Sequence, residues 1–232
     1  RRRPHLRVGR RRFAVVLLAA MALAASAVAE RAPWEPWIGN QRSGYPTLSP
    51  GAPGNSTLQL LSVLRRPQTE LDRDSQVQAV LHDVGPRLQG IHTEYVRNLV
   101  PNVAWAAVTL VPVEAFSGAK GTGEALCLLY PTPGIEGTHG AELGCWAPAE
   151  ITAGAAVIAL RTVGRSHVVG LVPDGVASVR VTAVDGVTSV PVRENFFDDS
   201  PPSNRTGKLY SRIEWLNAAG DEIRQFDTDA SR

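Results

Sequence analysis

The sequence predicts an α+β fold in which two short N-terminal helices pack on a mostly antiparallel β-sheet or sandwich that carries one disulfide. Two apolar stripes of helical period, each followed by a proline, lie between residues 56 and 86. Beyond them, short valine-rich segments separated by Gly- and Pro-containing turns are typical of strands. With 44% hydrophobic and 20% charged residues, the composition excludes collagen-like, coiled-coil and wholly disordered chains.

Residues 1–29 have the three parts of an export signal. Seven arginines and no acidic residue lie in the first 12 positions, an apolar run covers 13–25, and Ala27-Val28-Ala29 has the small-residue pattern of a cleavage site. We expect a signal peptide that is cleaved before Glu30. The alternative is an uncleaved anchor, because the 17-residue stretch 13–29 reaches the short limit for a membrane-spanning helix.

The charge of the chain changes sign beyond this leader. The formal net charge is +2, but without the seven leader arginines the chain holds 17 basic and 22 acidic residues, a net charge of −5. Because nucleic-acid binding depends on Lys and Arg to neutralise phosphates, we expect no nucleic-acid partner. Membrane contact is expected only through the N-terminal segment, if that stays uncleaved. The predicted location is therefore the cell envelope or the extracellular space.

Residues 30–55 are predicted to be a linker, because they contain five prolines and four glycines and show no sustained periodicity. Trp34 and Trp37 lie on either side of Pro36 in this stretch. Their side chains either dock on the folded body or present two aromatic faces to a ligand. Both interpretations stay open from the sequence.

Two helices are expected at the start of a single α+β domain that covers residues 56–232. The first spans 56–66 and ends at Pro67, and the second begins after Asp74 and ends before Pro86. The apolar positions of the two helices are Leu60, Leu61, Leu64, Val77, Val80, Leu81 and Val84.

About eight short strands are expected beyond the helices. Four single strands, a short helix and two hairpins account for the pattern: strands at 103–116, 125–130, 141–146 and 166–172, the helix at 149–156, and hairpins at 179–192 and 213–226.

The segment 179–192 carries the strongest hairpin signal, because Asp185-Gly186 favours a two-residue turn between valine-rich arms. Pairing outward from that turn places Val181 opposite Val190, on a core face shared by Val179, Val181, Val190 and Val192. Pro191 then falls at a position that should exchange hydrogen bonds with the opposite strand, and proline has no N–H. We therefore expect an exposed edge or a bulge at Pro191.

The chain has two cysteines, Cys127 and Cys145, and their pairing is the favoured interpretation for an exported protein. A disulfide that closes a loop of this length stabilises a fold by about 3 kcal/mol in the chain-entropy model. The alternative is a thiol enzyme in which Cys145 is the nucleophile and His139 the base, as in cell-wall transpeptidases. Those enzymes have His-Gly directly before the cysteine, whereas Leu143-Gly144 stands here.

No other motif in the sequence carries a definite chemistry. The chain has no G-x-S-x-G, no H-E-x-x-H and no EF-hand loop. His92 and Glu94 share one face of a predicted strand, but such pairs are common by chance, and we expect no metal and no cofactor. The sequence therefore favours a non-enzymatic envelope protein that binds another protein or a wall polymer. The alternatives are the thiol enzyme and a membrane-tethered sensory domain.

Five segments and the pair Asp72-Arg73 together carry a family resemblance: the segments are 63–69 (VLRRPQT), 125–127 (ALC), 144–146 (GCW), 170–176 (GLVPDGV) and 193–197 (RENFF). Their combination resembles a group of uncharacterised exported proteins from high-GC actinobacteria, over about residues 58–226. The resemblance implies export, a bacterial source and pairing of Cys127 with Cys145. It implies no activity, ligand or catalytic residue.

Overall fold

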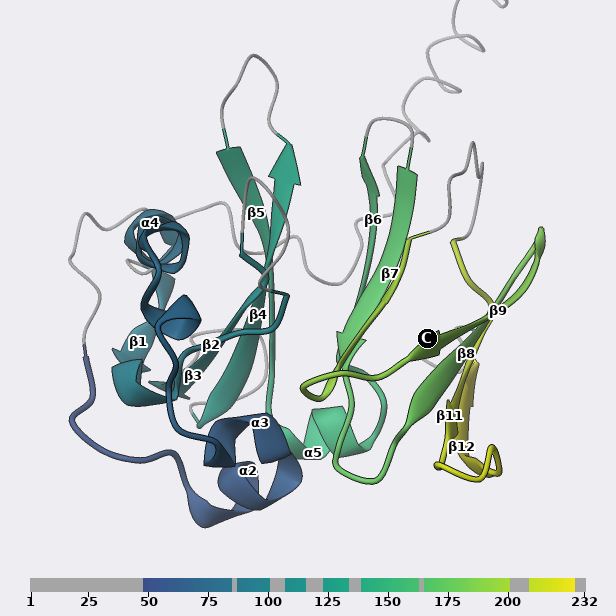
Figure 1. The fold of residues 1–232 in the computed structure, drawn as a ribbon, viewed down its shortest axis with the longest axis horizontal. Helices are drawn as coiled ribbons and strands as arrows, with labels where there is room; N and C mark the ends of the chain where they lie inside the picture. The colour runs from purple at the N-terminus through teal and green to yellow at the C-terminus, as the bar shows by residue number, and fades with distance from the viewer. Residues whose placement is uncertain are drawn as a thin grey trace, which may run out of the picture. The chain divides into compact units, whose positions relative to one another are not determined.

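The computed structural model describes residues 48–84, 87–100, 107–115, 123–133, 139–162, 165–200 and 209–227 (Figure 1). All of them belong to one compact unit, residues 41–232. The fold is mostly antiparallel β-sheet with few helices and one disulfide, which confirms the predicted class at that level. The predicted leader, most of the predicted linker, and both Trp34 and Trp37 lie outside the described residues.

The predicted helix over 56–66 is two short helices, α2 (Asn55–Leu60) and α3 (Ser62–Arg65), so the prediction of one continuous helix is wrong. Leu61 between them is extended, with φ −125° and ψ 113°, and is fully buried. The Asp174 loop binds the backbone on both sides of it: the N–H of Asp174 donates to the carbonyl of Leu60, and the N–H of Ser62 donates to Asp174 Oδ1 at 2.7 Å. These bonds replace the helical bonds that a continuous helix would make there.

The other helices follow the expected capping chemistry. The 3₁₀ turn η2 (Leu71–Arg73) leads into α4 (Ser75–Val84), where the carboxylate of Asp74 accepts the N–H of Gln76 at 2.7 Å. The short helix predicted over 149–156 is α5 (Pro148–Thr152), which begins at a proline. A further 3₁₀ turn, η4 (Thr93–Tyr95), stands where a strand was predicted to carry His92 and Glu94 on one face.

The strands form three antiparallel sheets. Sheet 1 contains β1 (Gln89–Ile91), β2 (Arg97–Asn98), β3 (Thr109–Ala115), β4 (Ala125–Pro133) and β5 (His139–Trp146), in the order β1-β3-β4-β5 with β2 also paired to β3. Sheet 2 contains β6 (Val157–Thr162), β7 (Arg165–Leu171) and β10 (Phe196–Asp199), in the order β10-β7-β6. Sheet 3 contains β8 (Ser178–Ala183), β9 (Gly186–Pro191), β11 (Arg212–Leu216) and β12 (Glu222–Asp227), in the order β12-β11-β8-β9.

Three apolar clusters form the core of these layers. The first joins α3 and α5 to facing sides of sheets 1 and 2, the second joins α4 to the other side of sheet 1, and the third joins sheets 2 and 3. Strand β4 is buried on both sides, since Leu126 and Leu128 belong to the first cluster while Cys127 and Leu129 belong to the second. A strand covered on both sides has no polar face, which explains its unbroken apolar run.

The β8–β9 hairpin forms where predicted, but with a different turn. Val184 and Asp185 are the turn residues instead of Asp185-Gly186, so Val181 lies opposite Thr188 and not opposite Val190. Every partner thus shifts by two positions, and a shift of two leaves each side chain on the same face of the sheet. Val190 still lies on the core face, opposite Val179.

The altered register removes the conflict that Pro191 posed. Directly opposed residues of an antiparallel pair alternate between those that exchange hydrogen bonds and those that do not. The N–H of Val192 donates to the carbonyl of Ala177 at 3.0 Å, so the pair of Pro191 and Ser178 is one that exchanges no bonds. The missing N–H therefore costs the hairpin nothing, and the expected exposed edge is confirmed at Pro191.

Candidate functional site

The outer side of β9 is an edge with unsatisfied strand-pairing capacity. Among the described residues, β9 pairs only with β8. Residues of an antiparallel strand alternate between those whose backbone groups bond to the neighbouring strand and those whose groups point away from it. Val192 bonds to Ala177 on the β8 side, so the N–H and C=O groups of Val187 and Ser189 point away from β8. An extended chain laid along β9 would therefore find two donors and two acceptors at these residues.

The side chains of this edge are apolar or uncharged. None of the six residues of β9, Gly-Val-Thr-Ser-Val-Pro, carries a charge. Val187 is 58% exposed, and Val184 in the adjoining turn is 87% exposed. Natural edge strands normally carry charges, bulges or prolines that block pairing with another chain, and Pro191 is the one such device within β9.

The opposite edge of the same sheet, β12, has the usual protection. Its sequence is Glu-Ile-Arg-Gln-Phe-Asp, so three of its six residues are charged, and five of the six are exposed. Arg212 Nε and Asp227 Oδ1 form an exposed ion pair at 2.9 Å beside it. Both edge strands of sheet 3 are thus exposed to solvent, but only β12 carries charged residues. Substitutions on β12 therefore serve as controls for the same substitutions on β9.

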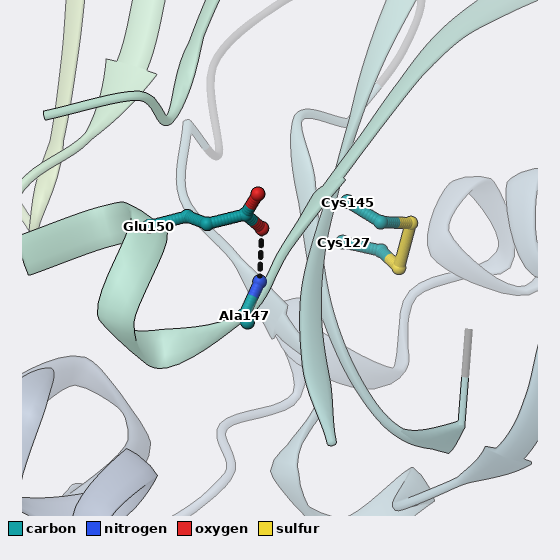
Figure 2. The surroundings of a disulfide bond; sticks show 4 residues. All are labelled: Cys127, Cys145, Ala147 and Glu150. Carbon is teal, nitrogen blue, oxygen red and sulfur yellow. Dashed lines mark hydrogen bonds between the residues drawn. A yellow bond between two sulfur atoms is a disulfide. The ribbon is translucent and has the colours of Figure 1, made fainter. Parts of the chain in front are cut away.

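The two cysteines form the disulfide that was predicted as the favoured state (Figure 2). Cys127 of β4 and Cys145 of β5 are directly opposed, with their Cα atoms 4.0 Å apart. Next to this strand pair, the N–H of Ala147 donates to Glu150 Oε2 at 2.8 Å at the start of α5. The bridge therefore staples one hairpin of sheet 1 at the point where the chain leaves it for α5.

The alternative role of Cys145 as a thiol nucleophile finds no support here. Its sulfur is bonded to that of Cys127, and the protein has no free cysteine. His139, the proposed base, lies six residues earlier on the same strand β5. Six residues of an extended strand span about 20 Å, far beyond the reach of a hydrogen bond.

A polar cluster not foreseen from the sequence gathers around His167 on β7. Its Nδ1 lies 2.7 Å from Ser200 Oγ and 2.9 Å from the hydroxyl of Tyr130 on β4. The Asp198 carboxylate accepts hydrogen bonds from the hydroxyls of both Tyr130 and Ser200. The members come from distant parts of the chain, so no spacing in the sequence could have indicated the cluster.

The bonding of this cluster does not match that of a nucleophilic serine. A catalytic triad places its serine and its carboxylate on different ring nitrogens of the histidine, whereas both Ser200 and Asp198 lie on the Nδ1 side of His167. The cluster therefore ties β4 to β7 and β10.

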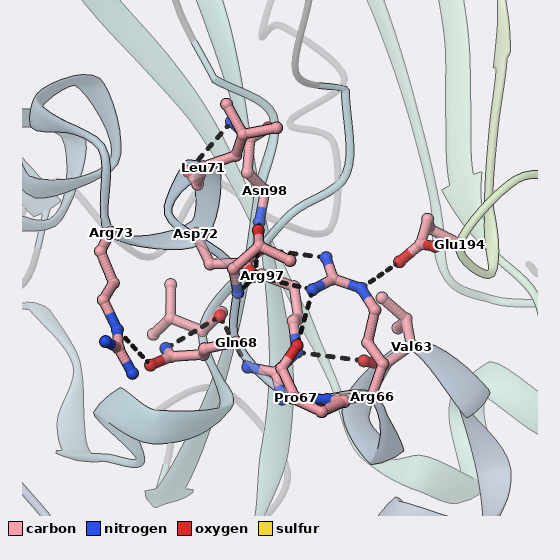
Figure 3. A network of polar contacts seen from close by, with 12 residues as sticks. Val63, Arg66, Pro67, Gln68, Leu71, Asp72, Arg73, Arg97, Asn98 and Glu194 are labelled. Atoms are coloured by element: carbon pink, nitrogen blue, oxygen red, sulfur yellow. Dashed lines mark hydrogen bonds and ion pairs between the residues drawn. The ribbon is translucent and has the colours of Figure 1, made fainter.

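A second polar network surrounds the buried carboxylate of Asp72 (Figure 3). Arg66 donates to both carboxylate oxygens at 2.6 and 3.0 Å, and the backbone N–H groups of Thr69 and Asn98 donate at 2.7 and 2.8 Å. Burial alone would raise the pKa of Asp72, but these hydrogen bonds lower it from 3.8 to about 2. Arg66 also reaches Glu194 at 2.6 Å, which links the helical region to the segment before β10.

Arg97 stands beside this network as a fully buried guanidinium. Its nitrogens donate to five backbone carbonyls, those of Val63, Leu64, Arg66, Glu94 and Val96. Burial lowers the pKa of Arg97, whereas the charge of Asp72 opposes that shift. All of these partners are backbone groups of the fold, so Arg97 holds the end of α3 against β2 and offers no donor to a ligand.

The loop before β10 is fixed by Asn195, which has φ +59°. Its Oδ1 accepts the N–H of Val63 and the hydroxyl of Ser62, both at 3.0 Å, and its Nδ2 donates to Val172 and Asp174. Asn tolerates a left-handed backbone better than most residues do. The segments 63–69, 170–176 and 193–197, singled out in the sequence, are thus joined by structural contacts.

The remaining expectations concern metals, membranes and known relatives. Within the described part of the chain, no three His, Cys, Asp or Glu side chains are grouped to hold a metal ion. No helix among the described residues has the length and apolar character needed to span a bilayer. Comparison with known proteins finds no matching family model, no similar curated protein and no similar solved structure.

Proposed function

We propose that this chain is an exported, non-enzymatic binding module that holds an extended segment of an envelope protein against β9 by strand addition. The observation that carries the proposal is the edge of β9, which is exposed, free of charge and equipped with outward backbone groups at Val187 and Ser189. A module that works in this way needs a rigid sheet and no catalytic residue. Its affinity comes from backbone hydrogen bonds, and its selectivity comes from side chains beside the edge.

Two features support the exported location. The Cys127–Cys145 bridge is the form that cysteines adopt in an oxidising compartment, and residues 1–29 have the pattern of an export signal. The resemblance to exported actinobacterial proteins agrees with both. An envelope protein meets partners in extended conformation, such as linkers and termini of neighbouring proteins, and these are the segments that strand addition selects.

Amide exchange with a strand probe tests the proposal. In the free protein we expect the N–H groups of Val187 and Ser189 to exchange quickly, and those of Thr188 and Val190, which face β8, to exchange slowly. A soluble acetylated peptide of alternating threonine and valine should slow the exchange of Val187 and Ser189. Two N-methylated forms of the peptide provide a further check. Methylating the alternate amides that point toward β9 should abolish the protection, whereas methylating the intervening amides, which point away from β9, should preserve it.

Two charge variants provide the matched comparison. Ser189→Lys places a positive charge on the exposed edge of β9, and Gln225→Lys places the same charge on the exposed edge of β12. We expect the first to weaken probe binding at least tenfold and the second to leave it unchanged. Equal effects of the two variants would overturn the proposal, as would a protein that binds purified wall polymer and shows no alternating protection with the peptide.

A further inference from the structure

The outward backbone groups of β9 are arranged symmetrically about one residue. Val187 and Ser189 point outward, one on each side of Thr188, whose own backbone faces β8. An edge with this symmetry is complementary to itself, because a two-fold axis at Thr188 brings each outward residue of one copy opposite the other outward residue of its partner. Such isologous contacts are the usual basis of homodimers.

We infer that the strand accepted by β9 is β9 of a second copy of this chain. The inference rests on the proposed function of the edge and names its occupant. In this arrangement Val187 of one copy lies opposite Ser189 of the other, and the two such pairs exchange four backbone hydrogen bonds. Thr188 lies opposite its own symmetry mate, and β-branched pairs at directly opposed positions stabilise antiparallel strands.

The ends of the strand fit the same register. Pro191, which has no N–H to offer, lies opposite residue 185 of the partner, in the turn that precedes its β9. The proline therefore limits the pairing to the central residues without breaking it. Extending an antiparallel alignment past Pro191 would force an unpaired position into the ladder.

The charges beside β9 are complementary in this register. Asp185 precedes the strand and Arg193 follows it, and both side chains are exposed. Antiparallel pairing brings the beginning of one strand to the end of the other, so each Asp185 approaches the region of the partner's Arg193. The strand itself is uncharged, and two copies therefore meet without like charges directly opposed.

The contact is small, since only two residues per copy exchange backbone bonds. Interfaces below the standard size are weak and depend on concentration. We therefore expect reversible self-association that strengthens when the protein is confined to a surface. A disulfide across the two-fold axis converts this weak contact into a covalent product that can be counted.

Cysteine substitutions at three neighbouring positions test the register. Thr188→Cys should form a covalent dimer under mild oxidation, because the two residues would be directly opposed at about 4.5 Å between Cα atoms. Ser189→Cys alone should not, because its symmetry mate lies diagonally at about 7–8 Å. Mixing Val187→Cys with Ser189→Cys should restore the cross-link. Wild type, whose two cysteines are already paired, should give no covalent dimer.

Sedimentation of the wild-type chain gives a readout that needs no cysteine. We expect a monomer–dimer equilibrium that Ser189→Lys weakens at least tenfold and Gln225→Lys leaves unchanged. A wild-type protein that stays monomeric overturns the self-pairing. If the threonine–valine peptide still protects Val187 and Ser189 in that monomer, the proposed function survives with a foreign partner. If the peptide has no effect either, both proposals are wrong. Cross-linking of Ser189→Cys equal to that of Thr188→Cys also overturns the symmetric register.

Discussion

Replacing Asp72 with asparagine should be one of the most damaging isosteric changes in this protein. The side chain of Asp72 is fully buried and accepts hydrogen bonds from Arg66, Thr69 and Asn98. Asparagine keeps the shape but removes the charge that pairs with Arg66. It also turns one acceptor into a donor that faces other donors. Breaking a buried ion pair in this way typically costs about 3–5 kcal/mol.

The pKa of Asp72 gives a second, smaller value for the unfolding free energy that the charge of this carboxylate contributes. The folded state lowers it from 3.8 to about 2, and one pKa unit corresponds to about 1.4 kcal/mol, so ionisation contributes about 2 kcal/mol of stability. Since the folded pKa is the lower one, this contribution is fully present above the unfolded value of 3.8. It is lost as the pH falls toward 2, and about half remains at pH 3.

Urea denaturation of wild type and Asp72→Asn at pH 7, 5, 3 and 2 measures both effects. We expect a stability difference of about 3–5 kcal/mol at pH 7 that shrinks by about 2 kcal/mol by pH 2. Asp227→Asn is the control, because both side chains of its ion pair with Arg212 are exposed and solvent screens such surface pairs. A difference for Asp72→Asn that matches the control, or that stays constant with pH, would refute this account of the network.

Three further changes have outcomes set by local geometry. Gly170→Ala would place a Cβ 2.4 Å from the carbonyl oxygen of Ala156 and 2.7 Å from the Phe197 ring, so it should lower the melting temperature strongly, whereas Gly123→Ala, with no atom within 4 Å, should not. Asn195→Ala should be less stable than Asn195→Gly by about 1 kcal/mol in chemical denaturation, because both lose the side-chain bonds but only alanine is strained at φ +59°; equal stabilities would contradict that cause. Replacing both Cys127 and Cys145 with serine should cost about 3 kcal/mol of unfolding free energy, measured against wild type with and without reductant; wild type that is unaffected by complete reduction would show that the bridge is dispensable.

The sequence predicted the parts of the fold whose signals are local. The capping of α4 by Asp74 and the β11–β12 hairpin within residues 213–226 depend on neighbouring residues, and both form as expected. The β8–β9 turn was misplaced by one residue, because Asp185-Gly186 is the stronger local signal but would have put Pro191 at a bonded position. The cost of placing Pro191, at the far end of the same hairpin, in a hydrogen-bonded position outweighed the local preference for a turn at Asp185-Gly186.

The parts that the sequence could not predict depend on contacts between distant residues. The break at Leu61 comes from Asp174, more than a hundred positions away, and the His167 cluster joins three strands of two sheets. Strands β6 and β10 were also missed, because short apolar runs become strands only when β7 is present between them. The exposed edge at β9 was predicted only from the presence of Pro191. That this edge lacks the usual charged residues became evident only when the structure placed β12, which has three of them, at the opposite edge of the same sheet.

The bridge between Cys127 and Cys145 also determines how the protein would respond to a protease. Both cysteines belong to the same pair of neighbouring strands, so any single cut between them leaves the two fragments covalently joined. The eight residue pairs of β4 and β5 would continue to hold the fragments in register. A nicked molecule should therefore run as an intact chain on a non-reducing gel and separate into two pieces only after reduction. One cleavage event between the two cysteines would therefore leave the molecule covalently intact wherever proteases act on it.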